Sequence, residues 1–383
     1  MSKHVNKVTA AGLLVALGII YGDIGTSPLY VFNSIIKGRV VDETLILGTL
    51  SLIIWTITLL TTVKYVVMVL RADNRGEGDI FSRFALVKRQ KKWLVIPAMI
   101  GGAALLSDGI ITPPISITSA IEGLKELPQF HDLSQNTIVY IVLGIIAIFF
   151  FAQQFGTSSI GKLFGPFMSV WFGMLAILGL VHLSDDFTIF RALNPYYGIR
   201  VLVTYPEGFW LLGAVFLCTT GAEALYSDLG HCGRGNIRIS WIFVKTCLLI
   251  NYFGQGASIL KHHSGKLLDK ATLDAEGINA FYDLMPNWFI VPGVIIATSA
   301  AIIASQAMVS GSFTLISEAI RLNLWPKLKI NYPSEAKGQI FIPAINTLLF
   351  VGCVGVVLFF RESSKMEAAY GLAIITTMFM TTI

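Results

Sequence analysis

The chain contains ten long apolar stretches, and their recurrence constrains its fold more than any other feature. They lie near residues 8–36, 45–70, 94–121, 137–154, 165–183, 207–230, 240–260, 287–319, 340–360 and 367–383. About 20 apolar residues are what an α-helix needs to cross a bilayer. Charged residues make up 13% of the chain, against about 25% in a soluble domain. Because a membrane barrel would show short alternating segments instead, the pattern predicts an all-α integral membrane protein.

The distribution of basic residues predicts how the chain sits in the membrane. The loop after the second stretch, 71–92, holds seven Lys and Arg residues, and the loops after the sixth and eighth stretches hold more. All three loops fall on one side if every stretch crosses once. Since basic loops stay in the cytoplasm, we expect a cytoplasmic N-terminus in a multi-pass protein of the cell membrane.

Several functional classes are excluded by what the sequence lacks. No P-loop, dinucleotide fingerprint or metal motif occurs, and the four cysteines form no CxxC pair. The longest polar insert, near 261–286, is too short for a core of its own. We therefore expect one transmembrane domain over 1–383, with no enzymatic activity, no cofactor and no nucleic-acid partner. The last stretch is still apolar at Ile383, so we expect further helices or a soluble tail beyond it.

Four acidic residues inside or at the end of apolar stretches stand out: Asp23, Asp108, Glu122 and Glu223. A charged group at mid-membrane costs roughly 2.5–3.5 kcal/mol on insertion scales. Together the four would cost on the order of 10 kcal/mol unless they are neutralised or compensated. Acids in such places are therefore the first candidates for a functional site.

Asp23 lies in the middle of the first stretch, within the string GDIGTSPLY at 22–30. Glycine, threonine, serine and proline are poor helix formers, so we expect 22–28 to unwind and free its carbonyl oxygens. Unwound backbone is tolerated in a bilayer only where it is buried in protein or lines a cavity. With the carboxylate and the hydroxyls it would form a hard-oxygen site for a dehydrated alkali cation. The alternative is a proline kink in which Asp23 pairs with a neighbouring helix.

The sixth stretch has a similar interruption, TTGAEALYSD at 219–228, which contains Glu223. The first and sixth stretches open two sets of five, 8–183 and 207–383, of which the second is apparently truncated. Because five is odd, the second set must insert with the opposite topology. Interrupted segments at corresponding places of two inverted halves are typical of the midplane site of a transporter.

The third and tenth stretches add polar side chains whose roles stay open. Thr112 and Ser116 share a helix face and either line the site or satisfy carbonyls freed by the Pro113–Pro114 kink. Glu122 lies near a helix end, where a capping or interfacial role competes with a functional one. Tyr370 lies early in the tenth stretch, where an interfacial aromatic residue is the usual alternative.

Long strings of this sequence match one known family. They are GDIGTSPLY at 22–30, RADNRGEGDI at 71–80, ITPPISITSAIEGL at 111–124, GAEALYSDLGH at 221–231, INYFGQGA at 250–257, IASQAMVSG at 303–311 and AAYGLAI at 368–374. In these segments the chain resembles the KUP/HAK/KT family of potassium uptake transporters, with Ile250 as one conservative departure. The resemblance covers nearly the whole chain.

The resemblance implies a fold similar to LeuT and the amino acid–polyamine–organocation transporters, with a 5+5 inverted repeat and broken first and sixth helices. It also implies inward movement of potassium and protons, a homodimer, and further C-terminal helices followed by a cytosolic domain. The potassium ligands that it implies are Asp23, Tyr30, Thr112, Ser116, Thr219, Thr220 and Tyr370. The acids implicated in coupling are Glu122 and Glu223, and Asp108 is a further candidate.

The mechanism expected from these features is alternating access, in which potassium sheds its water onto oxygens between the broken helices. A buried acid would carry the proton, with Glu223 as the first choice and Asp23 as the second. The rival of the same class is an amino acid or polyamine carrier on this fold. A channel is disfavoured because no TVGYG-like filter occurs. An intramembrane aspartyl hydrolase would need Asp23 and Asp108 to face each other and share a proton.

Overall fold

The structure, a computed structural model, consists of helices and their connections in the part of the chain that it describes. That part comprises residues 8–71, 80–81, 92–127, 129–130, 133–155, 161–206, 208–223, 225, 232–269, 272–273, 278–332 and 340–382. Most of the basic loop 71–92, including the string RADNRGEGDI, and part of the insert 261–286 lie outside these residues.

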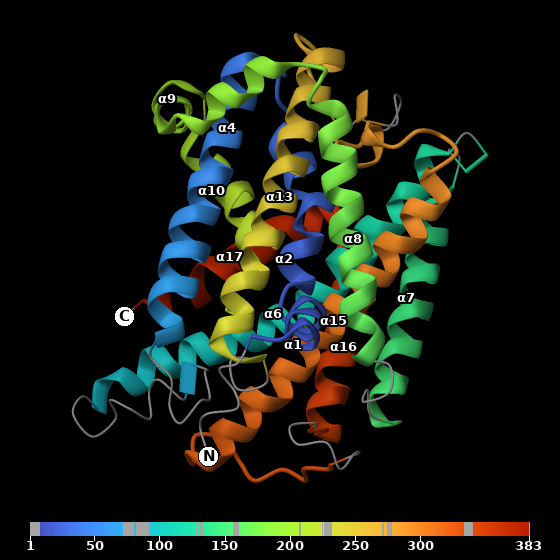
Figure 1. The fold of residues 1–383 in the computed structure, drawn as a ribbon. Helices are drawn as coiled ribbons and strands as arrows, with labels where there is room; N and C mark the ends of the chain where they lie inside the picture. The colour runs from blue at the N-terminus through green and yellow to red at the C-terminus, as the bar shows by residue number, and fades with distance from the viewer. Residues whose placement is uncertain are drawn as a thin grey trace.

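The long helices carry most of the fold. They are α4 (Glu43–Thr56), which continues as the π-helix η2 (Ile57–Met68), α6 (Val95–Glu122), α7 (Gln135–Ala152), α8 (Gly161–His182), α13 (Arg234–His263), α15 (Ile290–Arg321), α16 (Pro343–Phe360) and α17 (Ser363–Met380). In Figure 1, α4, α13, α8 and α7 run in roughly the same direction, and α6 and α17 cross that direction. α17 packs along α6, and α13 packs along α8.

Short helices connect the long ones and form the broken spans. The α-helical ones are α1 (Ala10–Ile19), α2 (Gly22–Thr26), α3 (Val31–Ile36), α9 (Pro195–Thr204) and α10 (Gly208–Phe216). The 3-10 turns are η1 (Ser27–Leu29), η3 (Val69–Arg71), η4 (Lys92–Leu94), η5 (Gly123–Glu126), η6 (Gln153–Phe155), η7 (Phe187–Leu193), η8 (Leu217–Thr219) and η9 (Tyr282–Leu284).

Seven helices of the described residues are long and apolar enough to cross a membrane, or eight if a bent pair at the N-terminal end counts as one span. The chain is thus an integral membrane protein with all-helical spans, as the sequence predicted. Two of the ten predicted stretches correspond to helices outside this set. The described part of the stretch 207–230 contributes the shorter apolar helix Gly208–Thr219. The stretch 367–383 belongs to α17, whose first turns also include Lys365 and Glu367.

The first predicted span is broken, but earlier than the sequence suggested. α1 ends at Ile19, and Gly22–Leu29 continues at an angle of 67° to it. The break therefore lies at residues 20–21, and the expectation that 22–28 itself unwinds is wrong. These residues form α2 and η1, because Pro28 occupies the first turn of η1, where its missing N–H breaks no helical hydrogen bond.

The sixth predicted span is interrupted as well. α10 tightens into η8, and the chain then turns at residues 220–223. Gly221 has a φ of +69°, the left-handed region that glycine enters without strain. Residues 224 and 226–228 of the predicted interruption lie outside the described part of the chain. The two interruptions lie side by side, since η1 contacts η8.

The amphipathic helix α9 was not predicted from the sequence. One face packs against α4, where a Cβ on Gly48 would lie 2.4 Å from the Cβ of Val201. The opposite face exposes Tyr196, Ile199 and Val203. An exposed apolar face on a short helix is typical of one that lies along a membrane surface.

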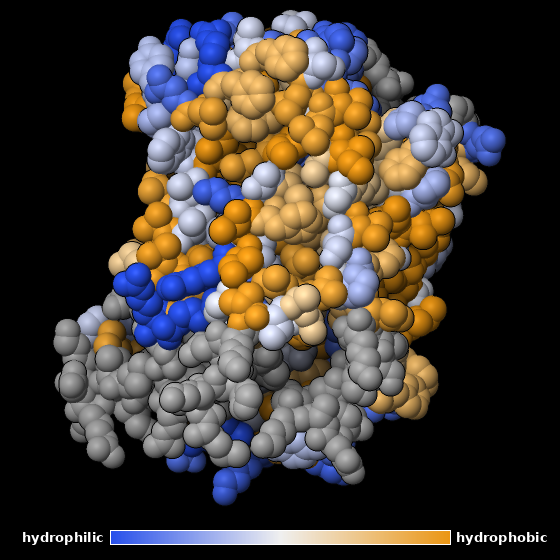
Figure 2. All heavy atoms as spheres, viewed as in Figure 1, coloured by the Kyte–Doolittle hydropathy of each residue, from blue (hydrophilic) through white to orange (hydrophobic). Residues whose placement is uncertain are grey.

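The outer surface is apolar around the middle of the molecule. Figure 2 shows a broad band of apolar side chains beneath a polar upper rim. Ile148, Val181 and Phe359 are among the large apolar residues exposed to the surroundings. Because a soluble protein seldom exposes so much contiguous apolar surface, this band is the face expected to meet lipid.

Candidate functional site

Close packing holds the broken first span at the centre of the bundle. A Cβ on Gly22 would lie 2.7 Å from the Cα of Ala304 in α15, and a Cβ on Gly25 would lie 2.8 Å from Phe172 in α8. The indole Nε1 of Trp171 donates to the carbonyl oxygen of Gly25 at 3.0 Å. Glycine is thus required where α2 approaches its neighbours, and the approach fixes Asp23, which is 1% exposed.

The turn of the sixth span faces Asp23 directly. A Cβ on Gly221 would lie 2.8 Å from the Cβ of Asp23 and 2.9 Å from its Oδ2. Only a residue without a side chain lets the two interruptions approach so closely. The backbone of one broken span therefore forms part of the wall around the carboxylate of the other.

Hydroxyl and carbonyl oxygens gather where the two interruptions meet. The Thr220 Oγ1 lies 2.6 Å from the Ser27 Oγ and 3.4 Å from the Tyr30 Oη. One of the Thr220 and Ser27 hydroxyls donates to the other, and the Thr220 Oγ1 and the Ser27 Oγ lie 3.5 and 3.4 Å from the carbonyl oxygen of Asp23. Thr26 donates to the same carbonyl at 2.9 Å, and its hydroxyl lies 3.4 Å from that of Ser116. We call this set the oxygen cluster: the Asp23 carbonyl and the hydroxyls of Thr26, Ser27, Tyr30, Ser116 and Thr220.

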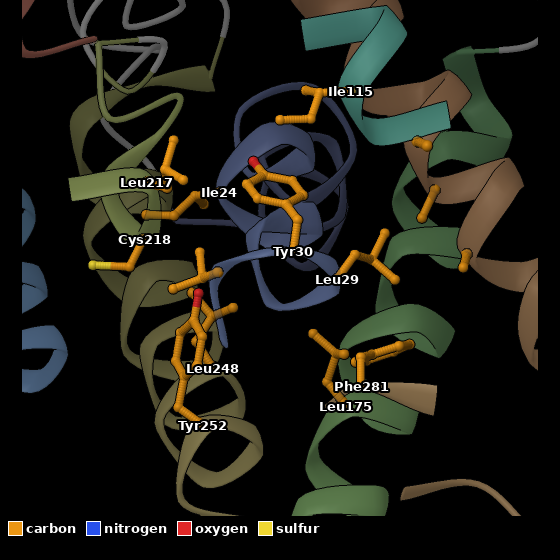
Figure 3. Close-up of a cluster of buried hydrophobic side chains, with 14 of the residues drawn as sticks. Ile24, Leu29, Tyr30, Ile115, Leu175, Leu217, Cys218, Leu248, Tyr252 and Phe281 are labelled. Atoms are coloured by element: carbon orange, nitrogen blue, oxygen red, sulfur yellow. The ribbon is translucent and has the colours of Figure 1, made fainter. Parts of the chain in front are cut away.

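Apolar side chains from several spans enclose the oxygen cluster. Figure 3 shows Tyr30 with Ile24, Leu29 and Leu217 around it, and Ile115 on the α6 side. Each of these apolar residues is at most 1% exposed. Because the surroundings have a low effective dielectric constant, the oxygens interact more strongly with a cation here than they would in water.

A second group of side chains links two buried carboxyl groups. The Tyr370 Oη donates to both carboxylate oxygens of Asp23 at 3.1 Å. It also lies 2.9 Å from the Thr112 Oγ1, which donates to the Asp108 Oδ1 at 2.8 Å. The result is a chain of four side chains, Asp23–Tyr370–Thr112–Asp108, that we call the carboxyl bridge. The two carboxyl groups are thus joined through two hydroxyls rather than facing each other as in an aspartyl hydrolase.

Counting hydrogens shows what the carboxyl bridge requires. It has three links, each of which needs one hydrogen, whereas the hydroxyls of Tyr370 and Thr112 supply only two. All three links are satisfied only if one carboxyl group is protonated. A proton on Asp108 turns both hydroxyls toward Asp23, and a proton on Asp23 turns both toward Asp108. The bridge is therefore able to hold one extra proton at either end.

Glu223 lies at the far side of the interruption, in contact with η2. The Tyr65 Oη donates to its Oε1 at 2.9 Å and lies 3.0 Å from the Thr381 Oγ1 at the end of α17. Glu223 is 6% exposed. The π-helical winding of η2 places Tyr65 toward the bundle, and such winding is frequent at functional sites.

Two predicted site residues lie apart from these groups. The Thr219 hydroxyl donates to the Phe216 carbonyl at 2.7 Å and lies 3.7 Å from the sulfur of Met378, so it satisfies the end of α10. Glu122 binds the first turn of α17, where its Oε1 accepts from the Ser363 backbone N–H at 3.1 Å and its Oε2 from the Ser363 hydroxyl. Glu122 therefore has the capping position that the sequence left as its alternative.

Sequence reasoning named no single hydroxyl of residues 22–28 as a ligand, and it missed Tyr65. Thr26 and Ser27 lie in the string quoted for Asp23, but their spacing alone did not show which hydroxyls face the sixth span. Tyr65 lies in an apolar stretch that appeared regular. A phenol toward the end of that stretch, beside Lys64, was the only sequence feature that pointed to it.

The chain is similar over its whole length to known proteins. Residues 10–383 match the family described as the K+ potassium transporter integral membrane domain. The chain is 62% identical over 386 residues to a probable potassium transport system protein Kup of Cytophaga hutchinsonii, with 98% of this chain and 56% of that protein covered. It is 56% identical over 388 residues to a probable Kup protein of Clostridium perfringens, with 99% and 58% covered. The chain spans somewhat more than half the length of these relatives.

Proposed function

The chain belongs to the family of potassium transporters whose membrane domain matches residues 10–383, and from this premise we propose that it imports potassium together with protons. The relatives named above are described as potassium transport system proteins. The observation that carries the proposal is the pair of broken spans that meet at Asp23. The first span supplies the Asp23 carboxylate, and the sixth span supplies the turn that lies against it.

The oxygen cluster supports potassium as the substrate. Its atoms are carbonyl and hydroxyl oxygens, with the Asp23 carboxylate beside them, and hard oxygen ligands replace the water of an alkali cation. We propose Asp23, Tyr30, Ser116 and Thr220 as ligands, with Thr26 and Ser27 in addition to those that the sequence indicated. Thr112 and Tyr370 border the same space through the carboxyl bridge. The family resemblance also implies Thr219, although its hydroxyl faces Phe216 in this conformation.

The carboxyl bridge supports a proton as the second cargo. A potassium ion on the Asp23 oxygens favours the charged form of that carboxylate and so places the extra proton on Asp108. Departure of the ion lets the proton return along Thr112 and Tyr370 to Asp23, so the position of the proton depends on the ion. For symport the proton is taken up from the outside with the ion, and it leaves the bridge to the inside after the ion has departed. Glu223 stays a candidate for passing the proton onward, because it is buried on the side that faces η2.

The wider mechanism belongs to the same proposal. The two adjoining broken spans support a LeuT-like 5+5 inverted repeat that works by alternating access. The basic loops support a cytoplasmic N-terminus in the cell membrane. We further propose a homodimer, on the family resemblance alone.

Coupling to a proton extends the gradient that the transporter sustains. Each elementary charge gains roughly 2.3 kcal/mol per 100 mV, and a tenfold gradient costs about 1.4 kcal/mol. Potassium alone therefore sustains about 1.6 decades at that voltage, and potassium with one proton sustains about 3.3 decades. A symporter has an advantage wherever external potassium is scarce.

The proposal is tested with purified protein in liposomes that contain a pH-sensitive dye. The wild type is expected to take up rubidium with accompanying protons. Asp23→Asn is expected to abolish rubidium uptake, and Asp108→Asn and Glu223→Gln are expected to lower the proton uptake per rubidium. Glu43→Gln, an acid on the surface of the first turn of α4, serves as the matched control. Rubidium uptake without protons in the wild type, or an unchanged ratio in all three variants, would overturn the proposal.

A further inference from the structure

Glu367 is a buried acid that the mechanism above leaves unused. It lies in the second turn of α17 and is 5% exposed. Its Oε1 is buried and has no hydrogen-bond partner. A buried carboxylate oxygen without a partner is costly, so native proteins compensate such atoms with a donor or a cation.

The neighbouring basic groups make no hydrogen bond to that oxygen. The Lys37 ammonium acts on the Glu367 carboxyl group through its charge alone, and it donates to the Ser364 hydroxyl at 2.7 Å. The Lys125 ammonium near Glu122 donates to the Gln135 side chain at 2.8 Å. Glu122 is itself bound by Ser363. The unpartnered atom is therefore the Oε1 of Glu367.

The position of Glu367 relates it to the central site. It precedes Tyr370 by three residues in α17, and Ser34 follows Tyr30 by four residues in α3. Residues three or four apart share a helix face. The helices α3 and α17 contact each other on both sides of Ser34 and Glu367. The contacts are the Lys37–Ser364 hydrogen bond of 2.7 Å and the edge-on pair of Tyr30 and Tyr370, whose ring centroids lie 6.3 Å apart. Ser34 and Glu367 thus form a second layer, one helical turn from the tyrosine pair.

The two layers lie along a line that leads to Asp23. Tyr370 donates to Asp23, and Tyr30 lies 3.4 Å from Thr220 in the oxygen cluster. On the side away from Asp23, Ser34 and Lys37 are only partly buried. The layer of Ser34 and Glu367 is therefore reached from the end of the bundle where α3 ends and α17 begins. In the topology proposed above, that end faces the outside of the cell.

We propose that Glu367 and Ser34 form an entry site for a monovalent alkali cation, separated from the Asp23 oxygens by the Tyr30–Tyr370 pair. The proposal rests on the proposed function, because it names the place where the transported ion first binds. The carboxylate Oε1 and the Ser34 hydroxyl supply hard oxygens, and water supplies the remaining ligands. The tyrosine rings then separate this site from the central one.

The test measures initial rates of rubidium uptake over a range of external rubidium concentrations, with each variant normalised to its amount in the membrane. Glu367→Gln is expected to raise the apparent KM about tenfold while the maximal rate stays within about twofold of the wild type. Ser34→Ala is expected to raise the KM in the same direction by a smaller factor. If the Glu367→Gln protein does not reach the membrane, the KM of the Ser34→Ala variant serves as the test instead.

Glu126→Gln is the matched control, since it removes an acid from η5 at the same end of the bundle. An equal rise of the KM in this control would show a general surface-charge effect and overturn the entry site. An unchanged KM in Glu367→Gln and Ser34→Ala would also overturn it. Failure of the proposed function is distinguishable from failure of the entry site, because the wild type itself would then take up no rubidium.

Discussion

At the scale of single residues, Gly221 is the most sharply constrained position of the site. Its φ of +69° is strained by about 1–2 kcal/mol for any residue with a side chain. A Cβ there would also lie 2.9 Å from the Asp23 Oδ2. We predict that Gly221→Ala lowers rubidium uptake more than tenfold at an unchanged amount of protein in the membrane.

Gly213 provides the matched control for this substitution. It lies in α10 of the same span, and a Cβ there would meet no atom within 4 Å. Gly213→Ala is expected to transport like the wild type. Equal uptake by both variants would contradict the close approach of Gly221 to Asp23.

Thr112 tests the carboxyl bridge without removing a charge. Thr112→Val keeps the shape of the side chain but leaves the Asp108 Oδ1 without its donor. Loss of a hydrogen bond to a charged group costs about 1.5–3 kcal/mol, which corresponds to roughly a 10- to 100-fold change in rate. We therefore predict that uptake falls by at least about tenfold, whereas Thr112→Ser retains it. Equal proton-coupled uptake in the valine and serine variants would show that the bridge is not the proton path.

The sequence indicated most of the residues that form the site, because acids and hydroxyls inside apolar stretches stand out. Asp23, Thr112 and Tyr370 were among these candidates, and the structure joins them in one hydrogen-bonded chain. The sequence did not indicate how they are linked. The link between Asp23 and Asp108 depends on α17 crossing α6, and contacts so distant in sequence leave no local pattern.

At the scale of elements, the long helices were predictable and the interruptions were less so. A stretch of about 20 apolar residues has few alternatives to a helix in lipid. The break of the first span was located at 22–28 from its poor helix formers, but it lies at 20–21. Tertiary packing of Gly22 against Ala304 decides where the chain bends, and it overrides the local preference. The helix α9 was missed because its 10 residues are too few to stand out as a span.

Asp185 helps to join two long helices, α8 and α13, to η9, and it lies outside the spans. Its carboxylate accepts from the His182 ring Nδ1 at 2.7 Å and from the Lys261 ammonium at 2.8 Å. The His182 Nε2 in turn lies 3.1 Å from the Leu284 carbonyl oxygen. Burial acts to raise the pKa of Asp185, but the hydrogen bonds from Lys261 and His182 outweigh it, so the pKa is lower than usual.

A lowered pKa in the folded state gives the Asp185 contribution a definite pH dependence. The stabilisation is present above the ordinary aspartate pKa of about 3.9 and is lost as the pH falls through the lowered folded value. We predict that Asp185→Asn lowers the thermal unfolding midpoint in detergent at pH 7, and that the difference from the wild type shrinks below about pH 4. A difference that stays constant down to pH 3 would contradict this assignment.

At the scale of the whole molecule, substrate class separates the proposal from its nearest rival. An amino acid or polyamine carrier on this fold would be stabilised by its own substrate, because a ligand that binds only the folded state raises the unfolding midpoint. We predict that potassium and rubidium raise the midpoint of the purified protein, that amino acids and polyamines leave it unchanged, and that Asp23→Asn abolishes the potassium effect. Stabilisation by an amino acid without potassium would favour the rival.

The central claim is that a bare cation binds between the two broken spans. The most direct measurement is an experimental structure of the protein in rubidium, with the ion located by its scattering. The account predicts rubidium in direct contact with the Asp23 carbonyl oxygen and the hydroxyls of Ser27, Tyr30 and Thr220. Rubidium bound elsewhere in the membrane domain, with these oxygens bonded only to one another, would contradict it.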